Sequence, residues 1–362
     1  MRKLVTVKKI DSIEEIATAD RLEIARIGGW QVVVPKGMYE AGEDVVYFEI
    51  DSIIPEQAGL EYLFGDKDSY HVKSSKMRGV LSQGIIAKLS IKPELANFEY
   101  DTDYSDLFGV TKYEASIASK DGGIKTKPFP FWLSKTDEIR YQSLIADYDI
   151  DIVPEDWMAF EKIDGTSFSC WCDEEGIGVA GRNQAFEDTD NNSYWNAFRA
   201  IKVGDKQLAD WLREIYNTYG RVALQGEMFG EGIQKNRIKM QGVHVRFFNL
   251  FINGQQITYE LVKKMYPDLI SIWVPVHDVE LTTDTDTNIE LSKRTTMMND
   301  SGADIEGLVW RHKDSISIKP NCNIDYAKVP EDKRVEFMIK ANTPIRASFK
   351  IINNNYLLKI GE

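Results

Sequence analysis

The sequence predicts an α+β protein in which a small β-barrel is followed by a larger domain of strands and a few helices. Three features lead to this fold class. Short β-branched or alternating runs separated by glycine turns fill the first quarter of the chain, and an acidic, irregular stretch follows them. Strand patterns and helical patterns then alternate up to the C-terminus. We therefore expect a first domain over residues 1–110, a linker over residues 111–127 and a second domain over residues 128–362.

The first domain is expected to be a closed barrel of the OB type. Gly28 and Gly29 predict a hairpin turn between two strand patterns, and residues 13–19 predict a short helix or turn. About five short strands punctuated by turns are typical of this barrel, which often binds oligonucleotides. The predicted strands cover residues 4–7, 21–27, 30–34, 44–50 and 84–89.

The second domain is expected to combine a mixed antiparallel sheet with a few helices. Residues 206–219 have a helical period that places Leu208, Trp211, Leu212 and Ile215 on one apolar face, and Gly220 is the expected helix stop. Two further helices are predicted over residues 194–200 and 259–266. The predicted strands include residues 221–229, 245–252, 306–311 and 348–352.

Composition and cysteine usage indicate a globular, intracellular protein, although the host compartment stays open and could be viral. The chain is 43% hydrophobic and 28% charged, which allows a substantial core. No apolar run is long enough to span a bilayer, so we expect no membrane partner. Cys170, Cys172 and Cys322 suggest neither a disulfide framework nor a metal site. Cys170 and Cys172 are expected on one face of a strand as small packed residues.

The net charge of −13 at first argues against a nucleic-acid partner. Acidic residues, however, concentrate in segments that we expect to be connectors, whereas basic residues gather between Lys67 and Lys92 and between Lys235 and Lys239. A local basic surface can still bind phosphates, because salt limits the reach of distant charges. An ordinary solvated face is an equally good explanation for either cluster.

Residues 161–166, Glu-Lys-Ile-Asp-Gly-Thr, are the stretch around which the second domain is expected to be organised. One residue separates Lys162 from Asp164, and Gly165 follows directly. This pattern suits a nucleophile in a tight turn where the backbone approaches a bulky ligand. Taken alone, the pattern is equally consistent with an ordinary Asp-Gly hairpin turn beside a solvated lysine. Its interpretation therefore depends on the motifs that follow it.

Those motifs occur in a fixed order: Arg182-Asn183, Gly226-Glu227, Phe248-Asn249, Glu306-Gly307-Leu308-Val309 and Phe349-Lys350. Together with Lys162-x-Asp164-Gly165, the set resembles the nucleotidyltransferase superfamily of ATP-dependent ligases and capping enzymes. Within that superfamily the chain is most similar to the RNA ligases of the Naegleria and Deinococcus type, which carry an N-terminal OB module and have a catalytic domain close to the RNA ligase 2 group. The resemblance covers most of the chain.

The resemblance implies a catalytic Lys162 that carries AMP covalently, and a catalytic Lys350 that holds the α-phosphate of ATP. It implies Mg²⁺ or Mn²⁺ at Glu306, with Asp164 joining through water. The implied ATP-binding residues are Glu161, Lys162, Ile163, Arg182, Glu227, Phe248 and Lys350. Arg182 is also an expected nucleic-acid contact, as are Lys76 and Arg78 of the basic run in the first domain.

Two implied positions leave alternatives open. Phe247 and Phe251 compete with Phe248 for the adenine, and the family register favours Phe248. The family's last motif often has two lysines at alternate positions, but Ser348 occupies the earlier one here. Arg346, Lys319 and Lys359 are candidates to supply the missing charge. Residues 313–343 form a longer link than is usual, which could be a substrate-contacting insertion or a tolerated loop.

The function that the resemblance implies is ATP-dependent RNA ligation and repair, which seals a 3′-hydroxyl end to a 5′-phosphate end in a nicked duplex or between free strands. A DNA ligase or capping enzyme is the alternative within the superfamily, but each would be expected to carry a large C-terminal OB domain after Lys359. A catalytically inactive nucleic-acid-binding homologue is the alternative from another class. Nothing in the sequence indicates a protein partner.

Overall fold

The structure is a computed structural model, and it describes residues 3–65, 67–100, 102–113, 125–148, 150, 152–319, 339 and 343–360. Residues 114–124 of the expected linker lie outside the described residues. The same holds for residues 320–338 and 340–342 of the long link, which include Cys322.

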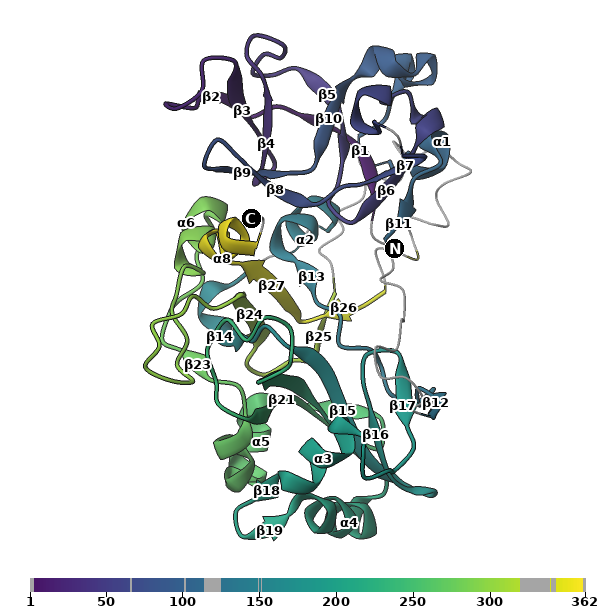
Figure 1. The fold of residues 1–362 in the computed structure, drawn as a ribbon, viewed down its shortest axis with the longest axis vertical. Helices are drawn as coiled ribbons and strands as arrows, with labels where there is room; N and C mark the ends of the chain where they lie inside the picture. The colour runs from purple at the N-terminus through teal and green to yellow at the C-terminus, as the bar shows by residue number, and fades with distance from the viewer. Residues whose placement is uncertain are drawn as a thin grey trace. The chain divides into compact units, whose positions relative to one another are not determined.

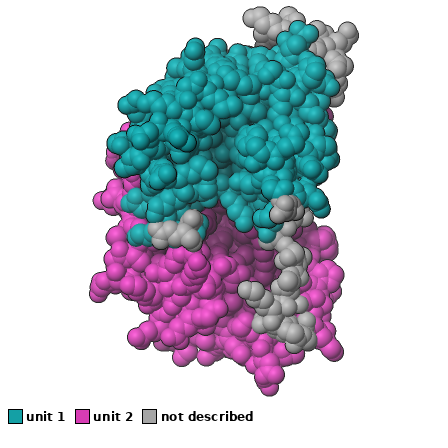
Figure 2. All heavy atoms as spheres, turned by 45° about the horizontal axis from the view of Figure 1, so that its top comes forward, with its two compact units in different colours: residues 1–117, 141–149, 354–362 teal, residues 118–140, 150–353 magenta. Residues whose placement is uncertain are grey.

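The chain divides into two compact units, which Figure 2 shows in teal and magenta. Unit 1 contains residues 1–117, 141–149 and 354–362, and unit 2 contains residues 118–140 and 150–353. The units therefore differ from the expected division in two short segments, 141–149 and 354–362, which belong to the N-terminal unit. They also differ in the expected linker 111–127, which is divided between the units after residue 117.

Unit 1 is built mainly of short antiparallel strands (Figure 1). The strand β5 lies between β1 and β10, while β2, β3 and β4 form a meander. Gly28 and Gly29 have positive φ angles of 53° and 79° in the turn between β3 and β4, which confirms the predicted hairpin. The strands are β1 (Val5–Lys9), β2 (Ser12–Glu15), β3 (Leu22–Ile27), β4 (Trp30–Pro35), β5 (Asp44–Phe48), β6 (Ser52–Pro55), β7 (Ser69–His71), β8 (Ser74–Met77), β9 (Val80–Gln83), β10 (Ile85–Lys88) and β11 (Thr111–Lys112).

The predicted helix or turn over residues 13–19 is wrong in its first part, because Ser12–Glu15 is the strand β2. Its pairing with β3 places Glu14 close to Arg26, and the two side chains form an ion pair at 3.0 Å. Opposite charges on paired strands favour this pairing. The local sequence pattern of residues 13–19 does not show the contact with Arg26, so it could not predict the strand.

Unit 1 also contains short helices. In α2 (Tyr141–Asp147), the Ser143 hydroxyl donates a hydrogen bond of 2.7 Å to the buried carboxylate of Glu49. The helix α8 (Asn354–Ile360) contacts β8 and β9. The remaining helices of unit 1 are α1 (Ser105–Phe108) and the 3-10 helices η1 (Glu56–Ala58), η2 (Glu61–Leu63), η3 (Leu89–Ile91) and η4 (Pro93–Asn97).

Unit 2 contains a sheet of seven strands in the order β12-β17-β16-β15-β20-β21-β22, with antiparallel neighbours throughout. Alternation along β15 places Cys170 and Cys172 on the same buried face, as predicted. The strands are β12 (Thr126–Pro128), β15 (Thr166–Asp173), β16 (Gly176–Ala180), β17 (Gln184–Phe186), β20 (Val222–Gly230), β21 (Val243–Ile252) and β22 (Gln255–Ile257).

A second sheet of unit 2 has five strands in the order β13-β27-β24-β14-β23. Its strands pair antiparallel except β13 and β27, which run parallel. The strands are β13 (Ile139–Arg140), β14 (Trp157–Lys162), β23 (Val276–His277), β24 (Gly307–His312) and β27 (Ser348–Ile352), and two small ribbons are formed by β18 (Lys202–Val203) with β19 (Lys206–Gln207) and by β25 (Ser317–Ile318) with β26 (Ile345–Arg346).

The helix α4 (Leu208–Tyr219) contacts β15 and β20 of the seven-stranded sheet. Its residues Leu208, Trp211, Leu212 and Ile215 are all buried in the main hydrophobic cluster, which confirms the predicted apolar face. The other helices of unit 2 are α3 (Ser193–Ala200), α5 (Tyr259–Met265), α6 (Thr285–Leu291) and the 3-10 helices η5 (Pro154–Asp156) and η6 (Pro267–Ile272).

None of the helices that the structure describes is long and apolar enough to cross a membrane.

Candidate active site

Lys162 is the last residue of β14, and a tight turn connects it to β15. A side chain at Gly165 in this turn would lie only 2.3 Å from the main-chain oxygen of Met228, so only glycine fits there. The sequence therefore places glycine at this position because the turn packs directly against the backbone of β20.

Lys162 and Lys350 lie on the same face of the five-stranded sheet. Lys162 pairs with Gly307 across β14 and β24, and Val309, two residues further, pairs with Lys350 across β24 and β27. Paired residues, and residues two apart on one strand, share a face. Residues far apart in the sequence are thus brought to one surface.

Glu306, just before β24, forms an ion pair with Lys162 at 2.6 Å. Burial by itself would lower the pKa of Lys162, but the carboxylates of Glu306 and Glu227 outweigh burial and raise the pKa above its ordinary value. Lys162 is therefore positively charged in this structure.

Lys350 has the opposite electrostatic environment. Burial, followed by the positive charges of Lys162 and Arg140, lowers the pKa of Lys350 to about 8. Arg140 pairs with Lys350 across the parallel strands β13 and β27. Two cations therefore occupy paired positions on this sheet.

Glu227 lies on β20 of the seven-stranded sheet and pairs with Ser167. Burial raises the pKa of Glu227 to about 8, with further contributions from Glu306 and Asp164, while Lys162 acts in the opposite direction. The carboxyl group of Glu227 is therefore protonated in a large part of the molecules at neutral pH.

Asp164 forms an ion pair with Arg237 at 2.6 Å. Arg237 lies in the loop between β20 and β21, where Gln234, Asn236 and Lys239 all have positive φ angles of 43–57°. Such backbone conformations are strained for residues other than glycine and often accompany functional loops. We refer to Lys162, Asp164, Glu227, Glu306 and Lys350, which were expected in the active site from the sequence, together as the catalytic cluster.

A β-bulge sets the direction of the Phe248 side chain. Gln225 pairs with Asn249 and Gly226 with Phe247, so Phe248 is an extra residue between two paired positions. Phe247 is fully buried in the core and Phe251 is buried in a second hydrophobic cluster, whereas Phe248 is only half-buried. Of the three aromatics considered from the sequence, Phe248 is thus the one with an accessible face.

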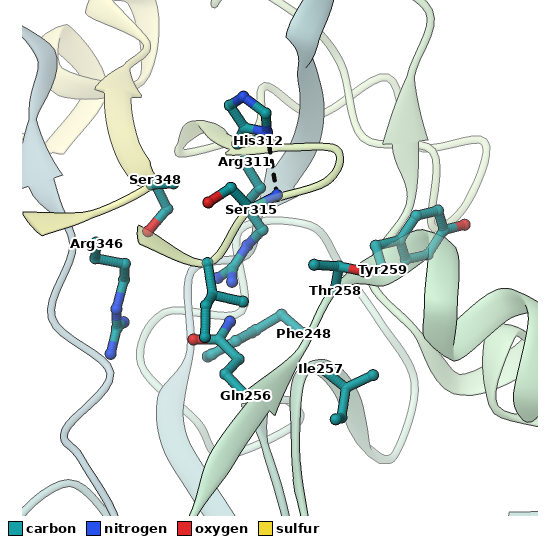
Figure 3. Close-up of a pocket in the computed structure, with 12 residues that line it drawn as sticks. Phe248, Gln256, Ile257, Thr258, Tyr259, Arg311, His312, Ser315, Arg346 and Ser348 are labelled. Carbon is teal, nitrogen blue, oxygen red and sulfur yellow. Dashed lines mark hydrogen bonds between the residues drawn. The ribbon is translucent and has the colours of Figure 1, made fainter. Parts of the chain in front are cut away.

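Phe248 and Arg311 line a small cavity between the two sheets of unit 2, together with Gln256, Arg346 and Ser348 (Figure 3). The guanidinium of Arg311 lies 5.4 Å from the centroid of the Phe248 ring. Among the described residues, the Nε of Arg311 has no hydrogen-bond partner. The cavity thus combines an aromatic face with an unused buried donor.

A network of buried hydrogen bonds and ion pairs holds Arg311. Its guanidinium donates to the Asn249 side chain at 2.6 Å and forms an ion pair with Glu138 at 3.0 Å. Glu138 also accepts from Arg346 at 3.5 Å and from the Ser348 hydroxyl. We refer to Glu138, Asn249, Arg311, Arg346 and Ser348 as the arginine cluster.

The arginine cluster also shows what surrounds Ser348, where the family often has lysine. Ser348 pairs directly with Arg311 across β24 and β27 and shares Glu138 with Arg346. Of the other two candidates, Lys319 is exposed and Lys359 lies on α8 of unit 1.

The side chains of Glu161 and Ile163 flank Lys162 in the sequence and point away from it. The Glu161 carboxylate accepts hydrogen bonds from Thr296 Oγ1 at 2.6 Å and from the main-chain N–H of Met297 at 2.9 Å, and it lies 3.2 Å from His277. Ile163 is buried in the main hydrophobic cluster. A contact of either residue with a nucleotide would therefore have to come from its backbone.

The remaining expected site residues are exposed. Arg182 forms an ion pair with Asp137 at 2.6 Å, and its charge also acts on Glu227. Lys76 and Arg78 belong to the β8–β9 hairpin of unit 1, where Arg78 adopts a positive φ of 52° in the turn.

No three His, Cys, Asp or Glu side chains gather closely enough to chelate a metal ion in the part of the chain that the structure describes. The donor set nevertheless fits a cation that keeps most of its water ligands, as Mg²⁺ does. The carboxylates of Glu306 and Asp164, together with the ionised fraction of Glu227, surround Lys162 with negative charge and raise the pKa of Lys162.

Four residues that belong to these clusters or contact them were not found from the sequence: Arg140, Arg237, Glu138 and Arg311. Arg237 lies in a basic run that the sequence showed, but nothing local linked it to Asp164, 73 residues away. Arg140 and Glu138 reach their partners only through the parallel pairing of β13 with β27. Arg311 lies two residues after the Glu-Gly-x-Val motif. This position in the sequence was the one signal that could have pointed to Arg311.

Comparisons with known proteins agree with this arrangement. Residues 155–329 match a family model described as RNA ligase, and residues 4–89 match a model described as an OB-fold domain. A search of curated proteins found no match.

Solved structures of the Naegleria gruberi RNA ligase resemble the whole chain. Its structure with pyrophosphate is 28% identical, covers 99% of this chain and 99% of that chain, and has a TM-score of 0.72. A variant of that ligase with AMP and manganese is 27% identical and covers 100% of both chains with a TM-score of 0.72. A variant with ATP and manganese is 27% identical, covers 99% of each chain and has a TM-score of 0.73.

These matches confirm the predicted fold class, an OB-fold domain followed by a sheet-rich nucleotidyltransferase domain. Residues 155–329 therefore form an RNA ligase domain, and this domain follows an OB-fold domain.

Proposed function

We propose that this RNA ligase uses ATP to join a 3′-hydroxyl RNA end to a 5′-phosphate RNA end through an AMP carried on Lys162. The observation that carries the proposal is the contact of 2.6 Å between Lys162 and Glu306, with Lys350 on the same face of the sheet. Solved structures of the similar Naegleria ligase with ATP, AMP and manganese support the choice of nucleotide and metal.

The reaction consists of three transfers of one AMP group. In the first, Nζ of Lys162 forms a bond to the α-phosphorus of ATP, and the bond from that phosphorus to pyrophosphate breaks. In the second, a 5′-phosphate oxygen of RNA takes the AMP and releases Lys162. In the third, the 3′-oxygen attacks the 5′-phosphorus, which forms the phosphodiester bond and expels AMP.

The first transfer requires a neutral Lys162, since a protonated amine has no electron pair to donate. In the ligand-free protein the surrounding carboxylates hold this lysine in its charged form. We assign Glu306 as the ligand of Mg²⁺ or Mn²⁺, with Asp164 contributing through water. When bound, the ion supplies positive charge that offsets these carboxylates and the phosphates of ATP.

Lys350 is assigned to the α-phosphate. Its charged form is disfavoured by burial and by the nearby charges of Lys162 and Arg140, and a bound phosphate would stabilise it. As the α-phosphate gains negative charge in the transition state, a lysine already fixed on a strand stabilises that charge without reorganising. We assign Arg140, its strand neighbour, to the same phosphate chain.

The nucleoside is assigned to the surface of the seven-stranded sheet. The half-buried ring of Phe248 offers a face on which adenine can stack. Glu227 can accept from a ribose hydroxyl, and its protonated form can also donate. Arg182 is exposed near Glu227 and is assigned to the ribose or to a phosphate.

Unit 1 is assigned to RNA binding. Its OB-fold domain is a common scaffold for oligonucleotides, and its β8–β9 hairpin presents the exposed side chains of Lys76 and Arg78. The substrate is RNA with a 3′-hydroxyl and a 5′-phosphate, either at a duplex nick or between free ends. Because ATP is consumed, we infer an intracellular setting.

The direct test is the mass of the intact protein after incubation with ATP and magnesium. We expect an increase by one AMP in the wild type and none in Lys162→Ala. Lys206→Ala removes an exposed lysine that is paired with Glu214, and this variant should be modified like the wild type. An AMP adduct on Lys162→Ala at the wild-type level would remove Lys162 from its assigned role.

The choice of RNA over DNA is tested with two nicked duplexes that differ only in the terminal 3′ nucleotides. A 2′-hydroxyl provides a donor and an acceptor that deoxyribose lacks. A site with polar groups placed for that hydroxyl leaves them unpaired when it is missing, which lowers the rate by roughly a hundredfold. Equal rates of sealing on both nicks would indicate a general polynucleotide ligase.

A further inference from the structure

Glu306 lies just outside the regular sheet, so its direction is not set by strand pairing. The pairing of β24 with β14 and with β27 ends at Gly307 on both sides. A side chain at Gly307 would lie 2.2 Å from the main-chain oxygen of Ile351, so the strands are in close contact up to this point. Some other interaction must hold the backbone of Glu306.

Asn353 provides that interaction. It follows β27 directly, three residues after Lys350, and is fully buried. Its main-chain N–H donates to the carbonyl oxygen of Glu306 at 2.9 Å, and its side-chain amide donates to the carbonyl oxygen of Ile305 at 3.1 Å. These two carbonyls belong to the peptide groups on either side of the Glu306 Cα.

Fixing both peptide groups fixes the two backbone torsions between them, and with them the direction of the Cα–Cβ bond. We propose that Asn353 is a positioning residue that aims the Glu306 carboxylate at Lys162 and at the metal ion. The inference deepens the proposed function, since it rests on the assigned role of Glu306. Asn353 is fully buried, so its assigned role is to act through Glu306 and not through a contact with the substrate.

The geometry explains why asparagine suits this position. Both contacts are donations to carbonyl oxygens, and the side-chain amide is the second donor. Alanine keeps the bond from the main-chain N–H but leaves the buried oxygen of Ile305 without this donor. Aspartate would place an oxygen against that carbonyl. The peptide group before Glu306 is then free to rotate, and the carboxylate loses its fixed direction.

The chain offers a matched control in Asn288, which is also fully buried. Its side chain donates to the carbonyl oxygen of Thr282 and accepts from the main-chain N–H of Thr282, both at 2.8 Å. The Asn288 side chain also accepts from the Thr282 hydroxyl at 3.0 Å, so Asn288→Ala removes three part-buried hydrogen bonds, none of them directed at Glu306.

The test measures binding of Mn²⁺ to the full-length protein with α,β-methylene-ATP, from the loss of the free Mn²⁺ signal in electron paramagnetic resonance. We expect Asn353→Ala to bind Mn²⁺ about tenfold more weakly than the wild type, which corresponds to one lost hydrogen bond. Asn288→Ala should bind like the wild type although it loses at least as much thermal stability as Asn353→Ala, because it removes more hydrogen bonds. If Asn353→Ala does not fold, Asn353→Cys gives the same comparison, because cysteine has nearly the volume of asparagine and at most a weak donor.

A second arm repeats the substitution in a Glu306→Ala background. Asn353→Ala should then cause no further weakening, because the residue acts through Glu306. Wild-type binding by Asn353→Ala, or an equal weakening with and without Glu306, would overturn the positioning role. A wild-type protein that forms no AMP adduct would instead overturn the proposed function, so the two failures are distinguishable.

Discussion

The catalytic cluster and the arginine cluster both lie on the sheets of unit 2, yet they neutralise charge in different ways. In the arginine cluster, Glu138 is surrounded by Arg311, Arg346 and Ser348, and each of these contacts it directly. In the catalytic cluster, burial is the main reason that the pKa of Lys350 falls to about 8 and that of Glu227 rises to about 8, and neighbouring like charges add to both shifts. The arginine cluster therefore stabilises one structure. In the catalytic cluster, the protonation states of Lys350 and Glu227 can change when a charged ligand binds.

This difference predicts that substitutions in the arginine cluster mainly change stability and that substitutions in the catalytic cluster mainly change reactivity. Buried ion pairs are costly to break, because the remaining partner stays buried without compensation. Groups with shifted pKa values are instead common where a reaction needs them. Three experiments test the comparison, from the largest expected effect to the smallest.

Glu138→Ala is expected to lower the free energy of unfolding by about 3–5 kcal/mol, because it leaves Arg311 buried without its carboxylate partner. The side chains of Glu138 and Arg311 are only 7% and 11% exposed. Asp137→Ala is the matched control, since its ion pair with Arg182 is more than half exposed and should contribute less than about 1 kcal/mol. Urea unfolding measures both, and equal losses would show that the arginine cluster is not a structural network.

Glu306→Ala is expected to slow formation of the Lys162 adduct by at least about a hundredfold while changing stability little. The loss should be smaller for Glu306→Asp and should be reduced at high manganese, because both restore part of the metal coordination. Single-turnover adduct formation measures the rate. A metal-dependent wild-type rate in Glu306→Ala would exclude this carboxylate from the metal site.

The smallest expected effect is the pH dependence of ATP binding. With a pKa of about 8, Lys350 is charged below pH 8 and becomes neutral above it. If its charge binds the α-phosphate, ATP affinity should fall by at most about tenfold per pH unit above pH 8. Arginine stays charged throughout this range, so Lys350→Arg should flatten the decline. ATP titrations at pH 7 and pH 9 provide the measurement, and the same slope in both proteins would assign the titration to another group.

The sequence was sufficient for the longest helices and strands and for the motif order, because both depend on local patterns. The face of α4 and the hairpin at Gly28 and Gly29 follow from residue spacing alone. The identity of Phe248 as the accessible aromatic depended on a bulge, which shifts the alternation by one residue. Only the family register, and not the local pattern, favoured it.

The contacts that fix the directions of the site's side chains could not be predicted from local sequence patterns. Glu138 meets Arg311 across 173 positions and Ser348 across 210 positions, and Asn353 meets Ile305 across 48. Such contacts depend on which strands become neighbours and in which register, and a single sequence does not specify either. The strand β2 was missed for the same reason, since its partner β3 supplies the charge opposite Glu14.

The positions of the parallel strands β13 and β27 in the sequence limit how the protein can be divided into fragments. In the sequence, each of these strands is followed by a helix of unit 1, α2 after β13 and α8 after β27. The chain therefore enters unit 1 at Tyr141 and again at Asn354. A fragment that stops at residue 117 would lack the helix whose Ser143 binds Glu49, and it would also lack α8, which contacts β8 and β9. The OB-fold unit is therefore a discontinuous folding unit that no single cut releases, and its share in RNA sealing is better measured by point substitutions than by truncation.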